Sequence, residues 1–144
     1  MITVLVDTLS GDPPPCSKQL VASAAITALS ENGVDSGTVQ IVFSDDEHLR
    51  QLKKQFFDLD QYTDVIAFHL NEPDEVLEGE IYISMERARE NSQAYHESYH
   101  RELLRLVIHG SLHLAGYEDH TRKDQEHMRR LEDHFLEAIA DQPG

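Results

Sequence analysis

The sequence predicts an α+β domain in which a small mixed sheet of about four strands is layered with four to five helices. Three observations lead to this fold class. Short runs rich in β-branched residues occur between longer segments of helical periodicity. The segment 99–115 is apolar almost all round its middle, which is typical of a buried central helix. The 144 residues, 40% of them hydrophobic, are enough for one domain over 1–144 with a core that needs no disulfides.

Four segments are predicted as strands from their composition and alternation. Residues 2–6 form a short apolar run, and residues 38–43 alternate between apolar and polar side chains. Residues 65–70 and 80–84 are the other two candidates, and an exposed loop is expected between them over 69–75. The prolines of segment 11–15 exclude regular structure there.

The helices are predicted from apolar periodicity and from capping residues. Ser17 can cap a helix that continues to about Ser30 and ends at Asn32 and Gly33. Ser44 or Asp45 can cap a short helix that continues to about residue 56. Further helices are expected from about residue 85, over about 99–115, and over about 123–140, where apolar side chains form one stripe.

Composition and charge limit the classes of function. The chain has no apolar run long enough to span a membrane, and its first residues are expected to form a strand and not a signal peptide. Cys16 is the only cysteine, so no intrachain disulfide is expected and the cytoplasm is the predicted location. The formal charge of −15 argues against a nucleic-acid partner, unless the protein works in a high-salt cytoplasm that screens the repulsion.

The segment 109–120 contains the pattern expected of a metal site. His109 and His113 are four residues apart on the predicted central helix, so their imidazoles lie about 40° apart around its axis. Two imidazoles in this arrangement can bind one transition metal. Gly116 can end the helix, after which either Asp119 or His120 can return as the third ligand. Three protein ligands would leave a fourth position for a water molecule, as in hydrolytic sites.

The same residues allow interpretations other than a metal site. His109 and His113 can be structural histidines, but they interrupt an apolar helix, where unpaired polar groups are costly. Gly110 stands where the HExxH peptidases have their glutamate base, so that route of peptide hydrolysis is disfavoured. Glu102 lies two turns before His109 and can hydrogen-bond a histidine or act near the water; alternatively, it is a carboxylate at the solvated start of the helix. The histidines of the last helix are expected to be solvated: His127, His134.

Three motifs, in order, resemble those of the YbeY family of bacterial metal-dependent endoribonucleases. Residues 109–117 (HGSLHLAGY) match nearly every position of the signature H-G-x-L-H-L-x-G-Y-x-H. Residues 62–68 (YTDVIAF) resemble the family's P-T-D-V-L-S-F, and residues 77–84 (LEGEIYIS) resemble its L-G-D-I-x-I-S. The resemblance spans about residue 38 to the C-terminus.

The resemblance implies one zinc ion held by three side chains and cleavage of single-stranded RNA. The implied role is maturation of the small-subunit rRNA 3′ end and ribosome quality control, with rRNA and the ribosome or its small-subunit proteins as partners. Where the signature has its third histidine, this chain has Asp119, followed by His120. Register favours Asp119, whereas the preference of zinc for imidazole favours His120.

A second departure concerns the arginine that many family members carry six residues before the Thr-Asp pair. Phe57 occupies that position here. Cations that could replace it lie on the preceding predicted helix or at the start of the central helix: Arg50, Lys53, Lys54, Arg101, Arg105. Two alternatives to an endoribonuclease therefore remain: a metallohydrolase with a non-RNA substrate, and a non-catalytic ribosome-assembly factor with a structural metal.

Overall fold

The computed structural model describes residues 1–9, 11, 13–72 and 74–139. These residues form four strands and five helices in the order β1-α1-β2-α2-β3-β4-α3-α4-α5, which confirms the predicted α+β class. The strands are β1 (Ile2–Thr8), β2 (Gly37–Ser44), β3 (Val65–His69) and β4 (Leu77–Ser84). The helices are α1 (Lys18–Ser30), α2 (Asp46–Phe57), α3 (Met85–Ala94), α4 (Tyr99–Leu114) and α5 (Arg122–Ile139). The fourth strand starts three residues earlier than its sequence pattern indicated, and residue 140 lies outside the described residues.

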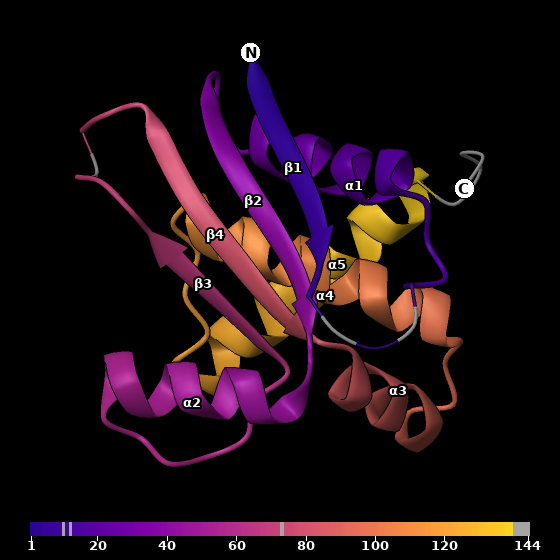
Figure 1. Ribbon diagram of the computed structural model, residues 1–144. Helices are drawn as coiled ribbons and strands as arrows, with labels where there is room; N and C mark the ends of the chain where they lie inside the picture. Colours follow the sequence, from indigo (N-terminus) through magenta and orange to yellow (C-terminus); the bar gives the residue numbers. More distant parts are fainter. Residues whose placement is uncertain (10, 12, 73, 140–144) are drawn as a thin grey trace.

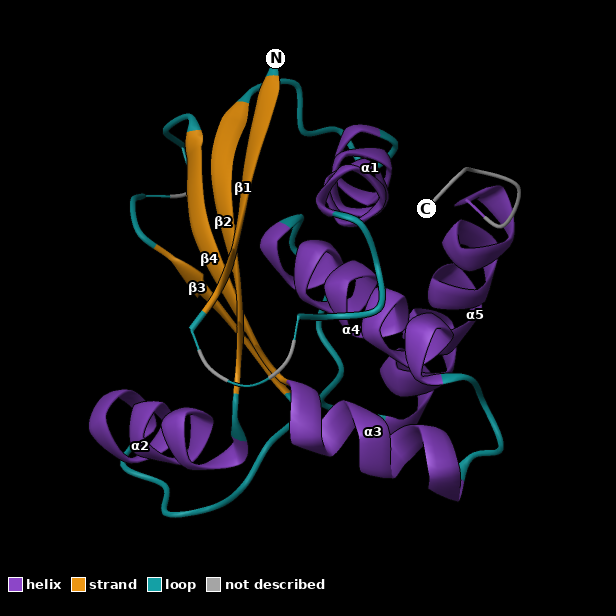
Figure 2. Ribbon diagram, turned by 45° about the vertical axis from the view of Figure 1, so that its right-hand side comes forward, coloured by secondary structure: helices purple, strands orange, loops and turns teal. Residues whose placement is uncertain are grey.

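The four strands form one mixed sheet in the order β1-β2-β4-β3 (Figure 1). Strands β1, β2 and β4 are parallel, whereas β3 lies antiparallel to β4 at the edge. Helices α1, α4 and α5 lie on one side of the sheet, and α2 and α3 lie at the end where β2 and β4 finish (Figure 2). The hydrophobic core fills the space between the sheet and the first of these helix groups.

Side-chain caps start the helices where the sequence indicated. The side chain of Ser17 accepts a hydrogen bond from the backbone N–H of Leu20, and Asp45 caps α2 in the same way through His48. Each cap satisfies a backbone donor that the first helical turn leaves unpaired. Among the described helices, none is both long and apolar enough to cross a bilayer.

Helix α4 is the buried central helix that the sequence predicted. It lies unusually close to β4 because Gly110 has no side chain: a Cβ there would lie only 2.6 Å from Cγ2 of Ile81. Eleven of its sixteen residues are buried, among them Leu103, Ile108 and Leu112. The close packing fixes the helix against the sheet and thereby fixes the direction of the two histidines on its partly exposed side.

Candidate metal centre

His109 and His113 lie one turn apart on α4, with their rings directed toward the same point. Their Nε2 atoms are 3.0 Å apart, and the ring centroids are 4.6 Å apart. Both side chains are partly buried, at 20% and 29% exposure, so they are shielded from bulk water without being closed off. The predicted pairing of the two imidazoles is therefore present in the fold.

The turn after α4 brings Asp119 to the two histidines. Gly116 has a φ of 108°, a conformation that favours glycine, and it reverses the chain immediately after the helix. Oδ2 of Asp119 lies 3.4 Å from Nε2 of His109 and 3.5 Å from Nε2 of His113. Gln125 on α5 donates a hydrogen bond to the backbone carbonyl of Asp119, which anchors the returning loop.

The neighbouring His120 is directed elsewhere. Its side chain is 77% exposed, and its charged contact is with Glu118 at 3.9 Å. His120 lines a cavity together with both histidines, but it is not in the group of donor atoms that lie within 4.8 Å of one another. Of the two candidates for the third ligand, the fold thus brings only Asp119 to the other two donors.

The outer nitrogen of each imidazole is held by a hydrogen-bond acceptor. Nδ1 of His109 donates to Oε2 of Glu132 on α5 at 2.7 Å, and Nδ1 of His113 donates to the backbone carbonyl of Tyr117 at 3.0 Å. A neutral imidazole that donates from Nδ1 has a lone pair on Nε2. Two lone pairs and a carboxylate oxygen therefore converge, an arrangement that repels itself unless a positive charge lies between the atoms.

This donor set fits a divalent transition metal. Ligand atoms about 2.0 Å from a tetrahedral zinc ion lie about 3.3 Å from one another, close to the separations of 3.0, 3.4 and 3.5 Å found here. Acceptors on the far nitrogens are also the usual partners of metal-binding histidines. His109, His113 and Asp119 thus form a candidate metal site.

The charges around the centre favour a cation as well. Burial lowers the pKa of His109, but the hydrogen bond and charge of Glu132, together with Asp119, outweigh burial and raise it. Burial and the nearby His109 lower the pKa of His113. Without a metal, His109 therefore binds a proton more readily than His113, because Glu132 offsets burial at His109, whereas burial and the neighbouring His109 both disfavour the charged form of His113.

Glu132 belongs to a buried ion network. Its other oxygen accepts a hydrogen bond from Arg105 of α4 at 3.2 Å, and the same guanidinium contacts Asp133 at 2.9 Å. The side chains of Arg105 and Glu132 are only 4% and 6% exposed. Arg105 therefore binds Glu132, the carboxylate that orients His109. It is not free to bind phosphate, although the sequence made it a candidate for that role.

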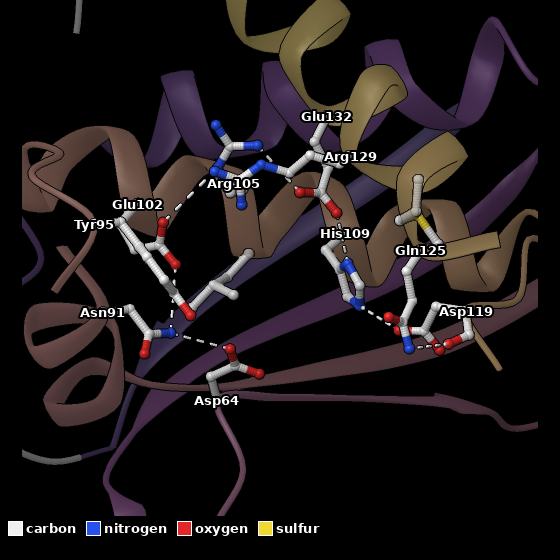
Figure 3. A pocket seen from close by; sticks show the side chains of 12 residues that line it. Asp64, Asn91, Tyr95, Glu102, Arg105, His109, Asp119, Gln125, Arg129 and Glu132 are labelled. Atoms are coloured by element: carbon white, nitrogen blue, oxygen red, sulfur yellow. Dashed lines mark hydrogen bonds and ion pairs between the residues drawn. The ribbon is translucent and has the colours of Figure 1, made fainter. Parts of the chain in front are cut away.

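Glu102 is buried, at 3% exposure, so the alternative of a solvated carboxylate at the helix start is wrong. It makes no hydrogen bond to either histidine; its Oε2 accepts from Nδ2 of Asn91, which also donates to Asp64 (Figure 3). Burial raises the pKa of Glu102, and the charge of Arg105 only partly offsets the effect. The histidine-orienting role considered for Glu102 is taken by Glu132.

Two cavities meet at the candidate metal site. One, of about 460 Å³, contains His109 and Asp119 together with Glu102 and Tyr95 (Figure 3). The other, of about 590 Å³, lies toward α2 and β3 and contains both histidines and Asp119. His109 and Asp119 thus line both cavities, which leaves room for a substrate beside the ion.

The second cavity is also where the missing arginine would be expected. Phe57 lines it, with Lys53 beside the ring. Arg50 is paired with Asp60 at 2.6 Å, and Arg101 forms ion pairs with acidic residues on α3's loop and α5. Of the cations that the sequence offered, Lys53 lines the second cavity, whereas Arg105, which lines the first, is paired with carboxylates.

The comparisons with known proteins agree with this geometry. The family model described as "Endoribonuclease YbeY" matches residues 15–140. The chain belongs to the YbeY family. A YbeY endoribonuclease from Cytophaga hutchinsonii is 45% identical over 95 residues, which are 66% of each chain. Another, from Porphyromonas gingivalis, is 34% identical and covers 91% of this chain and 86% of the relative. A solution structure from Thermotoga maritima covers 96% of this chain and 89% of its own, with a TM-score of 0.63 and 28% identity.

Several residues of this YbeY-family site were not identified from the sequence. Glu132 lies on α5 between Met128 and Phe135, in a stripe that is otherwise apolar. A carboxylate in such a stripe is a usable signal, because burying an unpaired charge is costly. Asn91 offered no such signal, and although Asp64 belongs to the motif of residues 62–68, its contact with Asn91 depends on how α3 and β3 pack. His127 and His134 are exposed, as predicted.

Proposed function

We propose that this chain is a zinc-dependent endoribonuclease that cleaves single-stranded RNA, acting in maturation of the small-subunit rRNA 3′ end and in ribosome quality control. The observation that carries the proposal is the convergence of three donor atoms at a point open to two cavities. Family membership supports the class of reaction. The proposed substrate implies a cytoplasmic location and the small ribosomal subunit or its proteins as partners.

The proposed ligands are His109, His113 and Asp119, and the proposed ion is one Zn²⁺ per chain. Two imidazoles and one carboxylate are a donor set that zinc accepts in catalytic sites with an open fourth position. The ion would supply Lewis-acid chemistry, which withdraws negative charge from a phosphodiester under attack. Glu132 and the carbonyl of Tyr117 would keep both imidazoles in the tautomer that presents Nε2.

Glu102 is the proposed proton-transfer residue. It lines the same cavity as His109, and its Oε1 has no hydrogen-bond partner among the described residues. A carboxylate whose pKa is raised by burial accepts a proton more readily near neutral pH than an ordinary one. The nucleophile that it would deprotonate is either a water molecule or the 2′-hydroxyl of the RNA itself, and Asn91 would hold the carboxylate in place.

The geometry also bears on two other functions, a non-catalytic assembly factor and a metallohydrolase with a non-RNA substrate. A structural metal in a non-catalytic assembly factor normally has four protein ligands, whereas the described residues offer three beside open cavities. A metallohydrolase with a non-RNA substrate is favoured by the net charge of −15, which repels polyanions. This second function would be indicated by hydrolysis of small phosphodiesters without hydrolysis of RNA.

The test is a cleavage assay with matched single-stranded and double-stranded RNA at low and high salt. Zinc-loaded wild type is expected to cleave the single strand, and His113→Ala is expected to lose both zinc and cleavage. His134→Ala is the matched control, because this histidine is exposed on α5 away from the site. Failure of metal-loaded wild type to cleave RNA at any salt concentration would refute the proposal.

A further inference from the structure

Each cavity beside the candidate metal site contains an exposed aromatic side chain. Phe57, at the end of α2, is 46% exposed and lines the cavity of about 590 Å³. Tyr95, at the end of α3, is 60% exposed and lines the cavity of about 460 Å³ (Figure 3). Single exposed aromatic side chains are common on protein surfaces, so it is the position of these two rings in the cavities that points to a ligand. The two cavities share His109 and Asp119 in their walls, so each ring lines a cavity that reaches the candidate metal site.

Each cavity also contains one cation that is not committed to an acidic partner. Nζ of Lys53 lies 5.3 Å from the centre of the Phe57 ring, and Arg129 lines the cavity that contains Tyr95. Neither cation forms an ion pair with any residue that the structure describes, unlike Arg105, whose guanidinium is paired with carboxylates. A positive charge next to an exposed ring is the combination that single-strand-binding proteins use for one nucleotide.

The ring of Phe57 is held in a fixed orientation. It stacks on Phe68 of β3, with ring centroids 5.7 Å apart and planes inclined by 18°, and Phe56 contacts the same Phe68 edge-on at 5.3 Å. A ring that is already oriented loses little conformational freedom when a flat ligand covers it. Because Nζ of Lys53 lies over this ring, the lysine has to move off the ring, toward a phosphate, before a base can stack there.

We propose that Phe57 and Tyr95 are stacking platforms for the two nucleobases on either side of the scissile phosphate, with Lys53 and Arg129 contacting the neighbouring phosphates. This inference rests on the proposed function, because it takes single-stranded RNA as the ligand. Bases in a duplex are already stacked on one another and cannot reach such rings, so the platforms select single strands.

Stacking also suits a protein with this charge. The chain carries a net charge of −15, and carboxylates surround the centre, so an electrostatic groove of many cations is not available. Base–aromatic stacking does not depend on neutralising phosphates and is tolerant of sequence. RNA would therefore be held mainly by two bases and by only two phosphate contacts.

The first test measures the binding of a short fluorescent RNA by anisotropy and, in parallel, KM and kcat for its cleavage. Phe57→Ala and Tyr95→Ala are each expected to weaken binding about tenfold, with unchanged zinc content. Phe57→Trp and Tyr95→Phe keep a ring and are expected to bind as wild type does. Tyr62→Ala is the matched control, because Tyr62 is 54% exposed but lines neither cavity.

RNAs with one abasic nucleotide separate stacking from an indirect effect on the fold. Removing the base on one side of the cleaved bond is expected to abolish the effect of Phe57→Ala, and removing the base on the other side that of Tyr95→Ala. Equal losses with intact and abasic RNA, or losses no larger than for Tyr62→Ala, would overturn the stacking proposal. If the stacking proposal fails in this way while wild type still cleaves RNA, the proposed endoribonuclease function stands. If wild type does not cleave RNA, the proposed function itself is refuted.

The second test concerns the two cations. Each phosphate contact to a single strand contributes about 0.7 to the slope of log affinity against log salt. Lys53→Ala and Arg129→Ala are each expected to reduce that slope by about this amount relative to wild type. Lys54→Ala is the control for Lys53, because the neighbouring lysine lines neither cavity. If the slope of log affinity against log salt is unchanged in both variants, Lys53 and Arg129 do not contact phosphates.

Discussion

Glu132→Gln is expected to weaken zinc binding without unfolding the protein. In wild type, Nδ1 of His109 donates to a Glu132 oxygen at 2.7 Å, and this carboxylate is almost fully buried. The glutamine oxygen can still accept that hydrogen bond, so the imidazole keeps its tautomer, but the negative charge beside it is lost. The imidazole becomes a weaker base and the ion loses a nearby counter-charge.

The expected magnitude follows from two independent considerations. A hydrogen bond to a charged group contributes about 1.5–3 kcal/mol and an ordinary one about 0.5–1.5 kcal/mol, so loss of the charge alone costs roughly 1–1.5 kcal/mol; mutation of the partner of a metal-binding histidine usually weakens metal affinity about 10- to 100-fold. A tenfold change in an equilibrium constant is about 1.4 kcal/mol, so the two ranges overlap. The dissociation constant for zinc, measured by competition with a chromogenic chelator, should therefore rise about 10- to 100-fold.

Asp133→Asn is the matched control for this experiment. Asp133 contacts the same guanidinium of Arg105 at 2.9 Å, but it is 53% exposed and does not touch His109. Because Asp133 is half exposed, water can take its place beside Arg105, so this variant should change zinc affinity less than about twofold. Equal weakening in the two variants, or no weakening in Glu132→Gln, would show that Glu132 does not tune the centre through His109. Circular dichroism melts of both variants would confirm that they are folded.

Three further predictions concern the ligand set, the packing of α4 and the buried acid. Asp119→Ala is expected to lose bound zinc on dialysis while His120→Ala retains it, because only Asp119 faces the histidine pair; equal retention measured by atomic absorption would exclude Asp119 as an essential ligand. Gly110→Ala should lower the free energy of unfolding by about 1–3 kcal/mol in urea, because its Cβ would lie 2.6 Å from the fully buried Ile81; an unchanged urea midpoint would contradict the close packing. Burial raises the pKa of Glu102 above its ordinary 4.5. The protonated side chain therefore costs the folded protein no stability below pH 4.5, whereas the protein loses stability as the pH rises through the pKa of the folded state and the buried side chain ionises. Glu102→Gln should consequently melt at the same temperature as wild type in acid and at a higher temperature at neutral pH, and an equal difference at both pH values would refute this linkage.

Most of the fold was predictable because its determinants are local. Ser17 and the periodic apolar residues after it specify a helix that begins and ends where the sequence indicated. The boundaries of β4 were less accurate: Leu77 and Gly79 pair with Gly37 and Val39 of β2, and this pairing extends the strand beyond its own apolar run. Strand ends depend on the neighbouring strand, which the sequence does not identify.

The sequence by itself determined the two histidines and their common direction, because a spacing of four residues on a helix leaves them on one face. It also limited the third donor to two adjacent residues after Gly116. Only the tertiary structure decided which of the two, Asp119 or His120, lies beside the histidines, because the turn at Gly116 and the hydrogen bond from Gln125 of α5 orient this segment. The same holds for Glu132 and for the rings of Phe57 and Tyr95, which come from helices distant in sequence. Local periodicity specifies the side of a helix that a residue occupies, whereas the packing of helices on the sheet specifies which residues meet there.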